Sequence, residues 1–208
     1  MVNPIRMKTI FVRVVPLAVL LTVTLYSRSL YADSAALEQL RTSLASAQQI
    51  LLDPKLAGAK HIYQRRKLLR IILQQLFDFD EMSRRSLGAN ARKYKDRLAE
   101  FTPLFVDFLE HAYMGILETN GDAKIQYIKE ISDRDNVQIM TRTSLKDGSE
   151  YRVDYKLRPN TAGWRAYDVV VEGVSLVNNY RSQFDRFLNN KSFDELLLDL
   201  REKKEKFT

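Results

Sequence analysis

The 208-residue chain contains no cysteine, only two histidines and only seven glycines, which are scattered singly. Without cysteine we expect no thiol nucleophile, no thiolate metal site, no disulfide and no lipid-modified cysteine near the N-terminus. The histidines, His61 and His111, lie fifty positions apart, and only Asp107 stands at helical spacing from either. Single glycines do not form a phosphate-binding loop. These absences argue against thiol chemistry, resident metals and nucleotide hydrolysis.

A long apolar run is also missing. Residues 14–25 form an apolar stretch of about a dozen residues that includes a proline, whereas ~20 are needed to span a bilayer. Three basic residues precede this stretch, and Leu-Tyr-Ala at positions 30–32 resembles a cleavage site. We therefore expect residues 1–32 to be a secretory signal peptide cleaved near Ala32, with residues 33–208 as the exported domain. An uncleaved membrane anchor is the alternative interpretation.

The basic charge is concentrated in that leader. The chain has 33 basic and 26 acidic residues, a net charge of +7, and the leader contributes four basic and no acidic ones. Subtracting 4 from 33 leaves 29 basic against 26 acidic, so the remainder carries about +3. Nucleic-acid binding usually needs a concentrated basic stripe, so we expect no nucleic-acid partner.

The exported part has the pattern of a single α+β domain, in which helices precede strands and more helices follow. Apolar periodicity predicts helices over residues 34–52, 60–77 and 96–118, a short helix after Asp78, and two closing helices from Val174 and Phe193. Alternation predicts four strands over residues 124–132, 136–145, 150–158 and 164–173. We expect a curved four-stranded antiparallel sheet with helices on one face, enclosing an apolar cavity, and water on the other face.

The last predicted strand is the most informative segment. Tyr167, Val169 and Val171 alternate with Ala166, Asp168 and Val170 before Gly173 breaks the run and the period becomes helical. Acidic residues are poor strand formers, so Asp168 is the candidate general base if the fold is enzymatic. The structural alternative is an ion pair with an arginine of a neighbouring strand, such as Arg152 or Arg142.

Four segments resemble the MlaC family, also called toluene-tolerance auxiliary proteins. They are WRAYDVVVEGVSLVNNYRSQF (164–184), FDFDEMSRRSLG (77–88), HAYMGIL (111–117) and DYKLR (154–158). The resemblance implies a non-enzymatic periplasmic phospholipid carrier with no cofactor, whose cargo is a glycerophospholipid. It also implies exchange between an inner-membrane ABC transporter complex and an outer-membrane lipoprotein–porin complex, which maintains outer-membrane lipid asymmetry.

A carrier of this kind needs apolar side chains around the acyl tails. We expect lipid contacts from the helix over 96–118, from three strands and from the start of the following helix: Phe105, Phe108, Leu109, Tyr113, Leu117, Ile139, Val153, Tyr155, Tyr167, Val169, Val171 and Leu176. Ordinary core packing is the rival interpretation for each. Two other functions stay open, a small cone-fold isomerase or hydrolase using Asp168 and a periplasmic interaction module without a ligand.

A row of basic residues adds a second candidate surface. It comprises Lys60, Arg65, Arg66, Lys67 and Arg70 on one predicted helix, with Arg84 and Arg85 on the next. These side chains can meet phosphates or acidic docking partners, or form an ordinary solvated face.

Overall fold

The computed structural model describes residues 34–206, with side chains through residue 203. The predicted signal peptide and its cleavage site lie outside the described residues. Within the part that is described, no helix is both long enough and apolar enough to cross a bilayer.

The order of elements is α+β, as the sequence predicts. The helices before the sheet are α2 (Ala35–Leu52), α3 (Ile62–Leu76), α4 (Phe79–Leu87), α5 (Asn90–Lys93) and α6 (Leu98–Thr119), with short 3₁₀ turns η1 (Pro54–Leu56), η2 (Ala59–His61) and η3 (Lys95–Arg97). The strands are β1 (Lys124–Asp133), β2 (Asn136–Ser144), β3 (Glu150–Asn160), β4 (Gly163–Val171) and β5 (Val174–Ser175). Helices α7 (Leu176–Leu188) and α8 (Phe193–Lys206) follow them.

Helix ends form where the sequence places capping residues. The Asp78 carboxylate accepts a hydrogen bond from the Glu81 backbone N–H at 3.0 Å and begins α4. Gly88 ends α4 with a φ of +57°, a conformation that favours glycine. Ser192 and Glu195 exchange hydrogen bonds at the start of α8 and form the predicted capping box.

The sheet is antiparallel and open, with strand order β1-β2-β3-β4-β5. The prediction of four strands is wrong by one. Val174 and Ser175 turn back and pair with Val171 and Val170, so they form a two-residue strand where the sequence suggested the start of a helix. Helix α7 therefore begins at Leu176, with Ser175 as its N-cap.

A register shift in β4 corrects the predicted alternation. Leu157 pairs with Ala166 and Lys156 pairs with Asp168, which leaves Tyr167 as an extra residue. Because opposed residues share a face, Ala166 lies on the face of Val169 and Val171, and Tyr167 does not. A period of two cannot reveal one inserted residue, and this is why the prediction failed.

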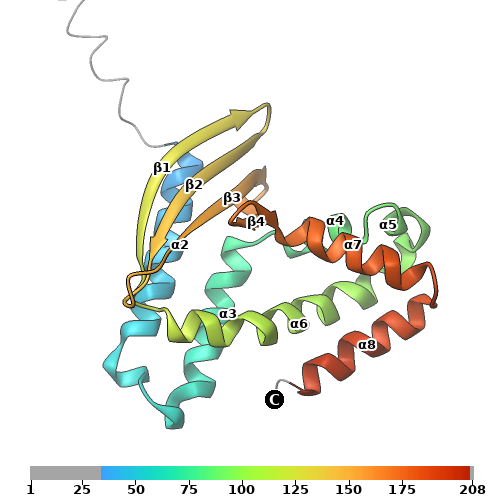
Figure 1. The fold of residues 1–208 in the computed structure, drawn as a ribbon, viewed down its shortest axis with the longest axis horizontal. Helices are drawn as coiled ribbons and strands as arrows, with labels where there is room; N and C mark the ends of the chain where they lie inside the picture. Colours follow the sequence, from blue (N-terminus) through green and yellow to red (C-terminus); the bar gives the residue numbers. More distant parts are fainter. Residues whose placement is uncertain (1–33, 207–208) are drawn as a thin grey trace, which may run out of the picture. The chain divides into compact units, whose positions relative to one another are not determined.

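Two separate hydrophobic clusters make up the core. The sheet cluster joins α2 to one sheet face: Ala36, Leu37, Leu40, Leu76, Val137, Ile139, Leu157 and Ala166. The helix cluster packs α4, α5, α6, α7 and α8 together: Met82, Leu87, Ala91, Phe101, Phe105, Phe108, Leu109, Val177, Tyr180, Phe184, Phe193, Leu196, Leu197 and Leu200. Phe77 packs against both. Figure 1 shows α4, α7 and α8 on the side of β4, away from β1.

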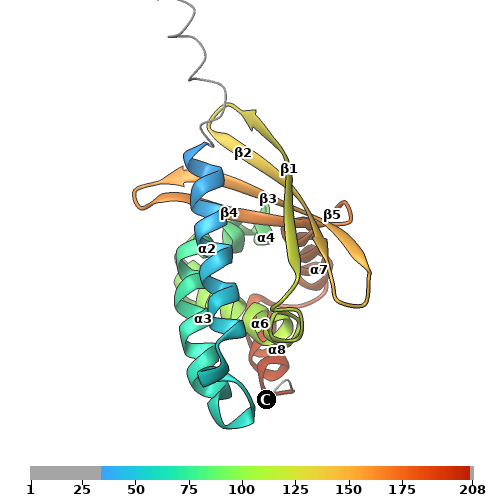
Figure 2. The same cartoon turned by 90° about the vertical axis from the view of Figure 1, so that its left-hand side faces the viewer.

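The two faces of the sheet differ in what covers them. Figure 2 shows α2 running across the sheet with α3 beside it. The opposite face was expected to meet water, yet Asp154 and Asp168 on that face are only 1% and 3% exposed. The Asp154 carboxylate accepts hydrogen bonds from Arg152 at 2.7 Å and from Gln138 at 2.9 Å. These hydrogen bonds satisfy the buried carboxylate.

Candidate functional site

The face of the sheet toward α2 is only partly covered. At one end, α2 residues bury Leu157 and Ala166. Further along the same face, two rows of paired residues cross β2, β3 and β4. One row is Thr141, Val153 and Val171, and the other is Ile139, Tyr155 and Val169. Val153, Tyr155 and Val169 are half-buried, and Val171 is 43% exposed. We call these four residues the open sheet surface.

The twelve predicted lipid contacts divide into three groups. Seven are tied to the clusters, with Phe105, Phe108, Leu109, Tyr113 and Leu176 in or against the helix cluster and Ile139 and Tyr155 in or against the sheet cluster. Leu117, Val153, Val169 and Val171 belong to neither cluster. Tyr167 lies apart from the others, beneath the guanidinium of Arg85 at 4.1 Å.

The buried α6 residues are already packed by other helices. The Phe105 ring stands 5.2 Å from the Tyr180 ring and 5.4 Å from the Phe184 ring, both edge-on. Tyr180 also approaches Phe108 edge-on at 5.6 Å, and its hydroxyl lies 3.3 Å from that of Tyr113. Burial raises the pKa of the Tyr180 hydroxyl, which the Tyr113 contact reinforces. These residues fill the helix cluster, whereas the open sheet surface has apolar area left to cover.

The Asp168 carboxylate fixes the junction between β4 and α7. It accepts hydrogen bonds from the Ser175 hydroxyl at 2.7 Å and from the Val177 backbone N–H at 3.1 Å. It forms an ion pair with Lys156 at 3.2 Å, so the prediction of an arginine partner, Arg152 or Arg142, is wrong. Arg152 pairs with Asp154 instead. A negative charge at a helix N-terminus is stabilising, so the geometry of Asp168 fits a structural role.

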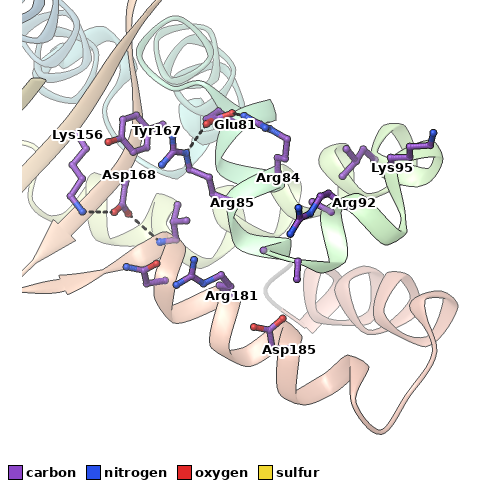
Figure 3. A pocket seen from close by; sticks show the side chains of 16 residues that line it. Glu81, Arg84, Arg85, Arg92, Lys95, Lys156, Tyr167, Asp168, Arg181 and Asp185 are labelled. Carbon is purple, nitrogen blue, oxygen red and sulfur yellow. Dashed lines mark hydrogen bonds and ion pairs between the residues drawn. The ribbon is translucent and has the colours of Figure 1, made fainter. Parts of the chain in front are cut away.

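A groove between α4, α5 and α7 gathers charge that is widely spaced in the sequence (Figure 3). Its volume is about 1080 Å³. Six basic side chains (Arg84, Arg85, Arg92, Lys95, Lys156 and Arg181) and three acidic ones (Glu81, Asp168 and Asp185) line it, which gives a net charge of +3. We call it the cationic groove. Sequence reasoning gave a possible functional role only to Arg84, Arg85 and Asp168 among these, because the other basic residues come from separate elements.

Glu81 organises the cations at one side of the cationic groove. Its carboxylate pairs with Arg84, with Arg85 at 2.6 Å and with Arg158 of β3 at 2.9 Å. Burial alone would raise the pKa of Glu81, but hydrogen bonds and attraction from Arg84 and Arg85 outweigh it and hold the pKa below its ordinary value. Glu81 is therefore a charged anchor between α4 and the sheet.

The basic row on α3 is largely neutralised by α6. Arg65 and Arg66 both bind Glu118 at 2.8 Å, and Arg70 binds Glu110 at 2.5 Å. These pairs fasten α3 to α6, so the row is in large part an inter-helix contact. Among the described side chains, no group of three or more histidines and carboxylates is arranged to hold a metal ion.

Comparison with known proteins identifies a family and a shared fold. A protein-family model described as "MlaC protein" matches residues 41–202. The solved structure of a phospholipid-binding protein from Ralstonia solanacearum, in complex with a phospholipid, superposes with a TM-score of 0.72 at 20% sequence identity. The superposition covers 85% of this chain and 99% of that chain, so the two share a fold.

Replacing Asp168 tests its structural role. Asp168→Asn removes the charge at the start of α7 and the ion pair with Lys156, so we expect a loss of about 1–3 kcal/mol in the free energy of unfolding, measured by urea denaturation. Asp199→Asn is the control, because the ion pair of Asp199 with Lys203 at 2.8 Å lies at the surface. We expect this variant to lose about 0.5 kcal/mol or less in the free energy of unfolding. Equal small losses in both variants would contradict this role.

Glu81 should make the free energy of unfolding depend on pH in the acidic range. Because its pKa is lower in the folded protein than its ordinary value of 4.5, its contribution is full above that pH and is lost as pH falls through the folded pKa. The wild type should therefore exceed Glu81→Gln in unfolding free energy near neutral pH, and the difference should shrink below about pH 4.5. A difference that stays constant across this range in denaturation curves would show that Glu81 is not the group responsible.

Proposed function

The chain belongs to the MlaC family, and from this premise we propose that it is a phospholipid carrier of the periplasm, with the lipid as cargo and without catalysis. The observation that carries the proposal is the open sheet surface, an apolar area that the chain's own helices leave partly uncovered. The Ralstonia solanacearum protein, which shares the fold, is described as bound to a phospholipid.

The size of the cargo explains why an uncovered apolar surface is useful. Two acyl chains hold about 30 methylenes, and exposing each to water costs ~0.8 kcal/mol, or about 24 kcal/mol in all. A carrier must remove most of that area from water, and its binding surface must therefore be apolar before the lipid arrives. In a protein without cargo, such a surface stands partly exposed.

Within the predicted set, we assign the contact with the tails to the sheet. Val153, Tyr155, Val169 and Val171 form the floor, and Ile139 continues it toward β2. The wall is formed by residues packed into the helix cluster or against it, namely Phe105, Phe108, Leu109, Tyr113 and Leu176. We do not place Tyr167 against the tails, because the extra residue in β4 directs it to the cationic groove.

The transport step completes the proposal. A soluble carrier exchanges lipid by docking at membranes or at membrane complexes. We propose the partners implied by the family resemblance, an inner-membrane ABC transporter complex and an outer-membrane lipoprotein–porin complex. Maintaining outer-membrane lipid asymmetry would then be the physiological result of that exchange.

A charge on the open sheet surface should prevent loading. We expect Val171→Asp to lower the fraction of protein that carries phospholipid at least about tenfold, because an unpaired carboxylate against acyl tails costs several kcal/mol. The measurement is native mass spectrometry of the exported protein, with organic extraction and identification of the bound lipid.

Ile131→Asp provides a matched control. Ile131 is 41% exposed against 43% for Val171, but its pairing with Gln138 places it on the opposite face of the sheet. It should load lipid like the wild type, and circular dichroism should show both variants folded. Equal lipid occupancy in the two variants would contradict the assignment of the tails to this face, and a wild type that never carries lipid would refute the carrier function.

A further inference from the structure

The cationic groove is lined by more basic side chains than carboxylates, six against three. Arg92 from α5, Lys95 from η3 and Arg181 from α7 all line it, and none forms an ion pair within the described part of the chain. Arg84 and Arg85, in contrast, share Glu81. Like charges held near one another repel, so this arrangement favours binding of an anion.

Arg181 is placed by the turn that ends α4. A side chain at Gly88 would put its Cβ 2.7 Å from Cδ of Arg181, so the stem of Arg181 lies against a position that only glycine leaves free. The positive φ of Gly88 also favours glycine at this position. The stem of Arg181 therefore lies beside Gly88, while the residue as a whole stays exposed at the cationic groove.

The shape of the cationic groove selects among anionic partners. A single phosphate group would occupy a small part of a space of about 1080 Å³. A flat bilayer surface could reach the exposed cations at the rim, but it would leave most of the volume of the cationic groove unfilled. An extended protein segment with several carboxylates can contact cations from three elements at once, and its stems can rest on the apolar floor at Leu98 and Val177.

We propose that the cationic groove is a docking site for an acidic segment of a partner protein. It is distinct from the open sheet surface, because its helical residues come from α4, α5, η3, α6 and α7. The sheet residues that line it, Lys156, Tyr167 and Asp168, are not those of the open sheet surface. Charge attraction across such a groove speeds encounter and fixes orientation. Docking through this groove leaves the lipid in place, so binding of a partner and binding of cargo are separable.

A labelled oligoglutamate peptide tests the proposal by fluorescence anisotropy with the intact exported protein. The variant is Arg92→Glu with Arg181→Glu. The control is Lys60→Glu with Lys67→Glu, which changes the net charge equally at two exposed positions on η2 and α3 that form no ion pair in the described chain. We expect the groove variant to bind the peptide at least about tenfold more weakly and the control less than about twofold. Wild-type affinity should fall between about 0.05 M and about 0.3 M salt, where screening increases.

The remaining outcomes would overturn the proposal. Equal weakening in both variants would mean that the peptide senses only net charge, and no measurable binding by the wild type would remove the site. If the groove variant binds phosphatidylglycerol vesicles more weakly than the wild type does but binds the peptide equally well, the groove is a site for membrane lipid. Lipid occupancy by native mass spectrometry should be the same in wild type and groove variant, so a failure here is distinguishable from failure of the carrier function.

Discussion

Strand β4 carries two of the attachments that join the sheet to the helices. At Ala166, Phe77 forms a parallel bridge and the Asp78 N–H donates to the Ala166 carbonyl at 2.9 Å. Two residues later, Asp168 holds the N-terminus of α7. Because the hydrophobic residues form two clusters that share Phe77, these polar contacts fix how the clusters meet. An apolar surface between separate clusters can stay uncovered only if such attachments hold its borders.

Local chemistry made most of the fold predictable. The capping residues Asp78, Gly88 and Ser192 act at the positions that the sequence indicates, and the α+β order and the first four strands follow from periodicity. The extra residue at Tyr167 was not predictable, because the alternation reads equally well with either face assigned to it. The two-residue β5 is too short to produce a pattern.

The site was less predictable because it depends on long-range pairing. The sequence does not distinguish a row of basic residues that faces solvent from one that forms ion pairs. In the structure, carboxylates of α6 bind Arg65, Arg66 and Arg70 of α3. Cations that form no ion pair in the described part of the chain instead meet at the cationic groove, from residues almost ninety positions apart such as Arg92 and Arg181. Similarly, apolar periodicity identifies Phe105 and Val171 alike, although the structure buries the first and exposes 43% of the second.

The most direct test of the central claim is to locate the acyl chains on the protein. A phospholipid with a photoactivatable diazirine in one tail would be loaded into the exported protein, activated and mapped by peptide mass spectrometry. The account predicts adducts on the peptides that contain Val153, Tyr155, Val169 and Val171, with competition by unlabelled phospholipid. Adducts confined to the opposite face of the sheet, around Gln138 and Ile131, or adducts that unlabelled lipid does not displace, would contradict it.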